Sequence, residues 1–246
     1  MSRSHPLITT VVFDLDDTLY DCYRQRVLAA HRSACQKMLT ASLRTAARQQ
    51  RLSLSQLARL RLGLFHQERN LMTLDQRLCA RLGWRGREAA RLARLGRRAY
   101  FSYPVRRLRL FPETLPTLRR LHRRGIRIFV LTAGLLRIQR AKVRVLGLDR
   151  SPYIRAIFYT GLLRGRGKTK FLRQVLDAEP DPRRVLVVGD RPDSEIRAAR
   201  ELRMWTVRRR GGEFANYEPQ HRLERPHFTL RRLSQIFRFG FRFGAA

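Results

Sequence analysis

Alternation of short apolar runs with helical segments in the second half of the chain is the feature that most constrains the fold. A helix that starts after Pro112 should end at Gly125, since glycine is a good helix stop. Strand-like runs then cover 126–132, 153–160, 185–190 and 204–209, and helical patterns cover 135–146, 168–178 and 193–203. Such alternation is typical of a doubly wound parallel sheet. The sequence therefore predicts an α/β fold, and VVFDL (11–15) adds a buried strand.

Residues 22–101 have a different texture, in which Ala, Leu, Arg and Gln dominate and leucines recur at helical spacing. No proline occurs from residue 22 until Pro104. Breaks near Ser53, Asn70 and Gly83 predict about four helices. We therefore expect residues 1–20 and 105–246 to form the α/β core and residues 21–104 to form an inserted helical cap. The terminal FRFGFRFG repeat predicts a frayed tail over 237–246. Its alternative is stacking on bases, because aromatic and arginine side chains suit single-stranded nucleic acid.

The chain has an extreme excess of basic residues, but these residues are not concentrated in one region of the sequence. The formal net charge is +34, yet only four of the 53 basic residues are lysines, and the arginines are spread over nearly the whole chain. Lysine serves well as a phosphate ligand, so its replacement favours a general coding bias over a nucleic-acid footprint. We expect only non-specific affinity for nucleic acid.

Location follows from what the sequence lacks. The first ten residues are too short and polar for a signal peptide, and the apolar runs are far shorter than a membrane span. Cys22, Cys35 and Cys79 are odd in number and have no paired spacing, which favours reduced thiols. The expectation is a cytoplasmic protein without membrane contact.

Chemically useful side chains stand at the ends of the predicted strands. The stretch VVFDLDDTLYD carries Asp14 and Asp16 behind the first strand, Thr132 ends the second, and Asp190 ends VLVVGD. Lys168 begins the helix that precedes VLVVGD. Ligands of open parallel sheets bind at the carboxyl ends of the strands, so these side chains should converge on one site.

Together these motifs resemble the haloacid dehalogenase (HAD) superfamily, over most of the chain. The matching residues are DxDxT (Asp14 to Thr18), Thr132 in LTAG, Lys168, and Gly189-Asp190 with Asp193 and Glu195. The insertion after the first motif is similar to the helical-cap subgroup, which includes phosphoglycolate phosphatase-like and pyrimidine nucleotidase-like members. The resemblance implies a Rossmann-like core under that cap.

The resemblance also implies roles for the residues that react. Asp14 would be the nucleophile that forms an aspartyl-phosphate, and Asp16 would protonate the leaving oxygen and later activate water. Thr132 and the backbone N–H at Ala133 would bind phosphate oxygens. Lys168 would neutralise the charge of the nucleophile and of the phosphoryl group.

A magnesium ion is the implied cofactor. Its ligands would be the carboxylates of Asp14 and Asp190, the backbone carbonyl of Asp16, and Glu195 acting through water. Mg²⁺ prefers hard oxygen ligands and keeps several waters. A divalent ion would explain why a basic protein gathers carboxylates here, since adjacent carboxylates otherwise raise one another's pKa.

Several assignments stay open. Lys170 rivals Lys168, because both stand in GKTKF, although only Lys168 directly follows the glycine-rich turn. Asp193 competes with Glu195 as the second acid, or else caps the next helix. The remaining polar residues of the first motif are expected to be structural, with Asp17 and Asp21 in turns or caps and Thr18 bonded to its own loop.

The resemblance implies a Mg²⁺-dependent phosphomonoester hydrolase that acts on a small phosphorylated metabolite. Haloacid dehalogenases carry tyrosine where Asp16 stands, so carbon–halogen cleavage is not expected. A phosphomutase would use the same residues and remains an alternative. A nucleic-acid-binding protein with a structural core is the alternative from another class.

Overall fold

The computed structural model describes residues 6–42, 52–161 and 167–244. The chain divides into two compact units. An α/β unit comprises Met1–Tyr23 and Val105–Ala246, and a helical unit comprises Arg24–Pro104. The first boundary falls three residues after the predicted residue 20, because the backbone N–H of Tyr23 donates to the Asp17 carboxylate at 2.8 Å and joins this segment to the α/β unit.

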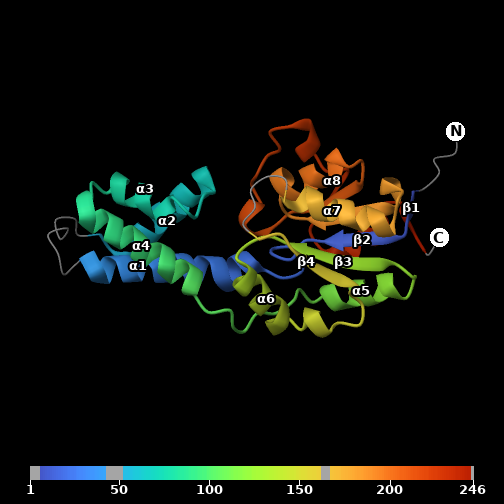
Figure 1. The fold of residues 1–246 in the computed structure, drawn as a ribbon, viewed down its shortest axis with the longest axis horizontal. Coiled ribbons are helices and arrows are strands. Elements are labelled where there is room, and N and C mark those ends of the chain that lie inside the picture. The colour runs from blue at the N-terminus through green and yellow to red at the C-terminus, as the bar shows by residue number, and fades with distance from the viewer. Residues whose placement is uncertain (1–5, 43–51, 162–166, 245–246) are drawn as a thin grey trace. The chain divides into compact units, whose positions relative to one another are not determined.

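A six-stranded parallel sheet forms the centre of the α/β unit (Figure 1). Its spatial order is β4-β3-β2-β5-β6-β7. The strands are β2 (Thr10–Phe13), β3 (Arg127–Thr132), β4 (Ala156–Tyr159), β5 (Val185–Gly189), β6 (Trp205–Arg209) and β7 (Phe228–Leu230). In the register, Val11 lies between Ile128 and Leu186. Every residue of β2 is buried, which explains why this strand reads as an unbroken apolar run.

Helices cover both faces of the sheet, so the predicted doubly wound α/β fold is confirmed. They are α5 (Thr114–His122), α6 (Leu136–Val145), α7 (Gly167–Ala178) and α8 (Arg197–Glu201). Figure 1 shows α5 and α6 on one face and α7 and α8 on the other. From β2 the chain builds outward through β3 and β4, then returns to β5 on the opposite side. The carboxyl end of β2 is therefore the switch point at which such sheets bind ligands.

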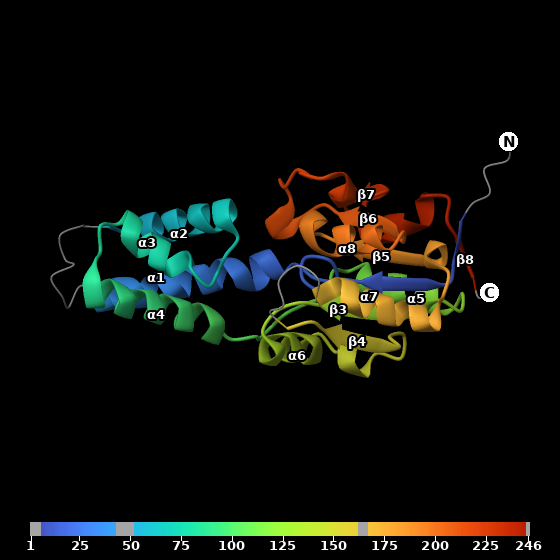
Figure 2. The same ribbon diagram turned by 45° about the horizontal axis from the view of Figure 1, so that its top comes forward.

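The C-terminal tail differs from the expected frayed segment. Strand β8 (Arg242–Phe243) pairs in parallel with β1 (Leu7–Ile8) at the other end of the chain (Figure 2). Phe241 is 9% exposed and lies edge-on to Trp205 and Phe228 at 5.7 and 5.3 Å between ring centroids. The FRFGFRFG repeat reflects an alternation of burial along the tail: the aromatic rings are buried or half-buried, while the arginines are exposed. Residues 245–246 lie outside the described part.

The described residues of the helical unit form four α-helices, as the leucine spacing predicts. They are α1 (Leu28–Ser42), α2 (Leu54–Glu68), α3 (Leu74–Arg81) and α4 (Gly86–Ser102), with a π-helical turn, η1 (Tyr23–Val27), before α1. Leu57, Leu78 and Leu92 meet in a shared apolar core. Ser53 caps α2 by a capping box with Gln56, which accounts for the predicted break there.

A buried ion pair crosses the core of the helical unit. The Arg61 guanidinium donates to both Asp75 oxygens at 2.8 and 2.9 Å, and both side chains are almost fully buried. His31 completes the group, with its Nδ1 2.6 Å from Arg61. Burial and the neighbouring Arg61 lower the pKa of His31 to about 2, so the imidazole is neutral and accepts from the guanidinium. Among the described residues, no helix has the length and apolarity needed to cross a membrane.

Candidate active site

Three adjacent strands end in the predicted site residues. Asp14 follows β2, Thr132 closes β3 and Asp190 follows β5. The backbone N–H of Asp14 donates to the carbonyl of Val188 at 2.8 Å, which extends the β2–β5 pairing to the edge of the site. All three residues are buried, with at most 6% of their surface exposed. Parallel pairing thus brings together residues that are far apart in the sequence.

Lys168 joins two of the acidic residues at the first turn of α7. Its Nζ lies 2.6 Å from Asp14 Oδ1 and 2.6 Å from Glu195 Oε2. Lys170, the rival lysine, is exposed. The geometry therefore favours Lys168 as the lysine of the site. The glycine-rich turn on which that choice rested includes residues 162–166, which lie outside the described residues.

Glu195, rather than Asp193, is the second acid beside Asp190. The sequence predicts a single helix over 193–203, but its first part is a π-helical turn, η5 (Pro192–Ile196), which presents Glu195 to the site. Gly189 makes room for it, since a Cβ there would lie 2.3 Å from Glu195 Cγ. Asp193 instead pairs with Arg191 at 3.3 Å, and Arg191 itself takes the N-cap position predicted for Asp193.

Carboxylate oxygens of Asp14, Asp190 and Glu195 all lie within 4.8 Å of one another. Burial raises the pKa of Asp14 to about 7, although Lys168 opposes the rise, and Glu195 adds repulsion. Burial also raises the pKa of Asp190 well above its usual value, with further repulsion from Glu195 and Asp14. Burial would lower the pKa of Lys168, but its two carboxylate partners outweigh burial and raise it.

One lysine among three buried carboxylates leaves an excess of negative charge. Buried charges normally need a partner or a metal ion. A hard divalent cation fits this set of oxygen atoms, both by ligand type and by charge. The residues present therefore match the predicted kind of cofactor.

Asp16 is held by residues that the sequence did not single out. Tyr20 donates its hydroxyl to Asp16 Oδ1 at 2.6 Å, while Lys142 Nζ and Gln139 Nε2 lie 2.6 and 3.0 Å from Oδ2. Burial would raise the pKa of Asp16, but Lys142 and these hydrogen bonds outweigh burial and lower it to about 2. One signal could have identified Lys142, since lysine is rare in this chain and two of the four lysines are buried beside the site.

Other polar residues of the first motif are structural. Asp17 has a left-handed backbone with φ of 55°, and its carboxylate accepts from the N–H groups of Tyr23 and Glu213 at 2.8 and 3.1 Å. This agrees with the turn role expected for Asp17. Thr18 differs from the expectation, because its buried hydroxyl has no hydrogen-bond partner among the described residues.

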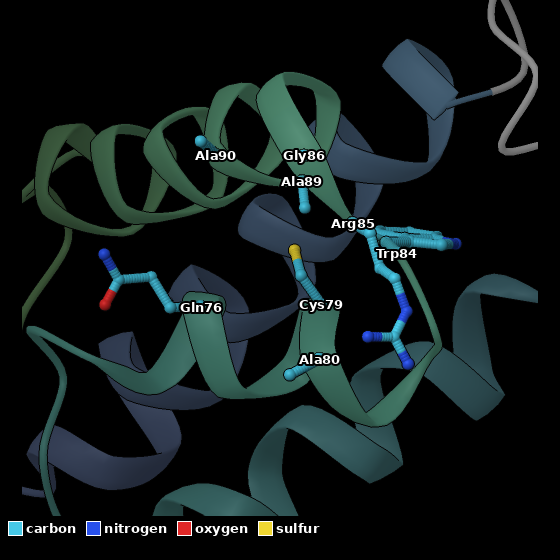
Figure 3. Close-up of a pocket in the computed structure, with 8 residues that line it drawn as sticks. All are labelled: Gln76, Cys79, Ala80, Trp84, Arg85, Gly86, Ala89 and Ala90. Atoms are coloured by element: carbon cyan, nitrogen blue, oxygen red, sulfur yellow. The ribbon is translucent and has the colours of Figure 1, made fainter.

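A cavity of about 420 Å³ lies in the helical unit, between α3 and the start of α4 (Figure 3). Gln76 and Cys79 of α3 and Ala89 of α4 are among its lining residues. Figure 3 shows the Cys79 sulfur directed toward α4. None of the lining residues is acidic, so this cavity offers no carboxylate site of the kind found at the sheet.

Comparison with known proteins identifies the family. The model of the haloacid dehalogenase-like hydrolases matches residues 8–203, which contain every site residue described above. The chain belongs to this family. The resemblance seen in the motifs is thereby confirmed.

Relatives and solved structures agree with the assignment. Glyceraldehyde 3-phosphate phosphatases of Methanopyrus kandleri and Methanocaldococcus jannaschii are each 28% identical to the chain, over 94% of the chain and 96% of their own length. The family and these relatives support phosphatase activity. Among solved structures, a predicted phosphoglycolate phosphatase from Haemophilus somnus has a TM-score of 0.63 at 16% identity over 94% of this chain and 97% of its own. The Bacillus subtilis protein YfnB bound to magnesium has a TM-score of 0.61 at 18% identity, with 94% and 98% covered, and it shares the fold.

Proposed function

We propose that the chain is a Mg²⁺-dependent phosphatase of small phosphorylated metabolites, which works through an aspartyl-phosphate on Asp14. The observation that carries the proposal is the ion pair of Asp14 with Lys168, next to the carboxylates of Asp190 and Glu195. Nucleophile, neutralising lysine and cation ligands are then within one small, buried group. A bound divalent cation would be held by Asp14, Asp190, the Asp16 carbonyl and Glu195, and would supply positive charge to the transferring phosphoryl group.

In the first step an oxygen of Asp14 attacks phosphorus while the bond from phosphorus to the substrate oxygen breaks. Lys168 holds Asp14 Oδ1 at 2.6 Å and so fixes the direction of the other oxygen. Thr132 and the Ala133 N–H would bind phosphoryl oxygens at the end of β3. The leaving oxygen takes a proton from Asp16 and departs as an alcohol.

In the second step water attacks the aspartyl-phosphate and releases inorganic phosphate and free Asp14. Asp16 accepts the proton of this water. The ionised carboxylate that Lys142 favours suits this half of the reaction. The first half needs the protonated form, so proton delivery to the leaving oxygen competes with the contact from Lys142.

For the substrate, the two phosphatases of similar sequence point to a phosphorylated three-carbon aldehyde. Glyceraldehyde 3-phosphate is the substrate named for both, and the chain matches nearly their whole length. We therefore propose glyceraldehyde 3-phosphate as the first compound to test, followed by phosphoglycolate and pyrimidine nucleoside monophosphates.

The test measures released phosphate over this panel, with and without EDTA. We expect release from at least one compound, loss of release in EDTA and recovery on adding Mg²⁺. An unchanged rate in EDTA would refute the cation. Transfer of phosphate within the substrate, without release, would identify a mutase. No phosphate transfer from any compound would refute the proposal itself.

A further inference from the structure

Two residues of α6 face the site together. Gln139 and Lys142 are three positions apart, so they lie on the same side of the helix. They are only 3% and 4% exposed. Both reach the same oxygen, Asp16 Oδ2, at 3.0 and 2.6 Å. Both side chains are buried and both are directed at one carboxylate oxygen. The contact is therefore part of the protein interior and is not an interaction between exposed side chains.

Gln139 also ties the Asp16 carboxylate to the loop after β3. Its Nε2 lies 3.0 Å from Thr132 Oγ1 and within hydrogen-bond distance of the Ala133 carbonyl. The two hydrogens of Nε2 are shared among these three acceptors. The amide orientation is fixed because the Asp16 carboxylate and the Ala133 carbonyl only accept, so a flipped amide would turn Oε1 toward two acceptors. In this orientation Gln139 Oε1 is buried without a hydrogen-bond partner among the described residues.

Gly134 completes the arrangement. Its φ of 137° is one that other residues rarely adopt, and a Cβ at this position would lie 3.0 Å from Gln139 Nε2. The loop therefore approaches the Gln139 amide so closely that a side chain at position 134 would crowd it.

We propose that Gln139 and Lys142 are positioning residues that set the acid–base carboxylate of Asp16 and the hydroxyl of Thr132 relative to each other. The proposal rests on the proposed phosphatase function. Because Gln139 donates to Thr132 Oγ1, the hydroxyl hydrogen of Thr132 points elsewhere and is available to a phosphoryl oxygen. Lys142 and Gln139 together fix Oδ2 of Asp16, which directs the carboxylate that exchanges a proton with the leaving group and with water.

A leaving-group comparison separates this role from a merely structural one. An alkyl alcohol is a poor leaving group and depends on a proton from Asp16, whereas p-nitrophenolate leaves without one. Misplacing Asp16 should therefore reduce kcat/KM, which reports the steps up to loss of the leaving group, more for an alkyl phosphate than for p-nitrophenyl phosphate. General damage to the fold would reduce both rates alike.

The experiment measures kcat and KM of Lys142→Met and Gln139→Met with both substrates, using Lys170→Met as the matched control at an exposed lysine. We expect kcat/KM for the alkyl phosphate to fall about 10- to 100-fold, within the range of general acid–base effects, because the lost orientation of Asp16 outweighs the easier protonation that follows the loss of Lys142. The fall in kcat/KM for p-nitrophenyl phosphate should be several times smaller. KM should change little, and Lys170→Met should match the parent protein. Lys142→Arg, which keeps the charge, should recover part of the lost rate.

Adding Asp16→Asn tests whether the two residues act through Asp16. In that background Lys142→Met should cost little further kcat, since contacting residues are non-additive. Equal losses of kcat/KM with both substrates, or full additivity with Asp16→Asn, would overturn the proposal even if one of the two variants folds poorly. A parent protein that releases no phosphate from either substrate would instead refute the phosphatase function, and this inference with it.

Discussion

Replacing Asp190 by asparagine should make the metal-free protein more stable while removing its response to magnesium. Asp190 is 3% exposed and shares its surroundings with the carboxylates of Asp14 and Glu195. Lys168 hydrogen-bonds those two acids. An amide in place of the Asp190 carboxylate removes a buried negative charge without changing its shape.

The magnitude follows from the spacing of the carboxylates. Two unit charges 4.8 Å apart, the span that contains one oxygen of each carboxylate, repel by about 3.5 kcal/mol at an effective dielectric constant of 20. Asp190 faces two such neighbours, and Lys168 offsets part of the repulsion, which leaves on the order of 3 kcal/mol. For a chain of this size that is a rise in Tm of roughly 6 to 12 °C.

The sign of the pH dependence follows from the raised pKa of Asp190. Above its unfolded pKa of about 4, the unfolded state has lost a proton that the folded state retains, so stability falls as pH rises. The gain from Asp190→Asn should thus be small near pH 4 and grow toward neutral pH. Asp14, with a pKa of about 7, contributes in the same direction.

The assay is thermal unfolding in EDTA and in Mg²⁺, from pH 4 to pH 8. Mg²⁺ should raise the Tm of the parent protein, since a ligand at a hundred times its Kd adds about 2.7 kcal/mol. It should not raise the Tm of Asp190→Asn. Asp193→Asn is the matched control, because Asp193 pairs with Arg191 instead of joining the cluster. A metal-free Asp190→Asn variant that is less stable than the parent at neutral pH would refute this electrostatic reasoning.

Three further outcomes are expected. Gly189→Ala should destabilise the protein by about 1 to 3 kcal/mol and lower phosphate release, because a Cβ there would collide with Glu195. Urea unfolding and turnover measure the two effects, and unchanged stability and turnover would contradict this contact. Phe241→Ala should cost about 3 to 5 kcal/mol of unfolding free energy if the tail packs as described, whereas a frayed tail would make the change neutral. Nucleic-acid binding should fall steeply as the salt concentration rises and should show little sequence preference, whereas kcat/KM on a small phosphate should change much less. Gel-shift and turnover measurements over a series of salt concentrations test both expectations. Tight sequence-dependent binding at physiological salt would contradict a coding-bias origin of the charge.

The sheet and the strand-end residues could be predicted because periodicity and parallel geometry determine them together. Apolar runs that end in Asp14, Thr132 and Asp190 gave the strands, and parallel pairing requires that their carboxyl ends meet. The resemblance to the HAD superfamily implied a cation, which in turn explains why carboxylates gather at these strand ends. The choice between Asp193 and Glu195 needed the structure, since a π-helical turn alters which side chain faces inward.

Other features had little local signal, apart from the rarity of lysine that marks Lys142. Gln139 and Lys142 lie in an ordinary amphipathic helix, and only the rotation of α6 against the sheet shows that they face Asp16. The tail reads as low complexity, because its pairing partner, Leu7–Ile8, stands at the opposite end of the sequence. Both depend on contacts between distant segments, which a local pattern does not encode.

Acid quenching during a single turnover tests the central claim most directly. Substrate labelled in the phosphoryl group is mixed with excess enzyme and Mg²⁺, the reaction is stopped in acid, and peptides are analysed for the label. We expect a transient phosphoryl group on Asp14, absent from Asp14→Asn. Complete turnover with no label on Asp14 at any time, or label on another residue, would contradict it.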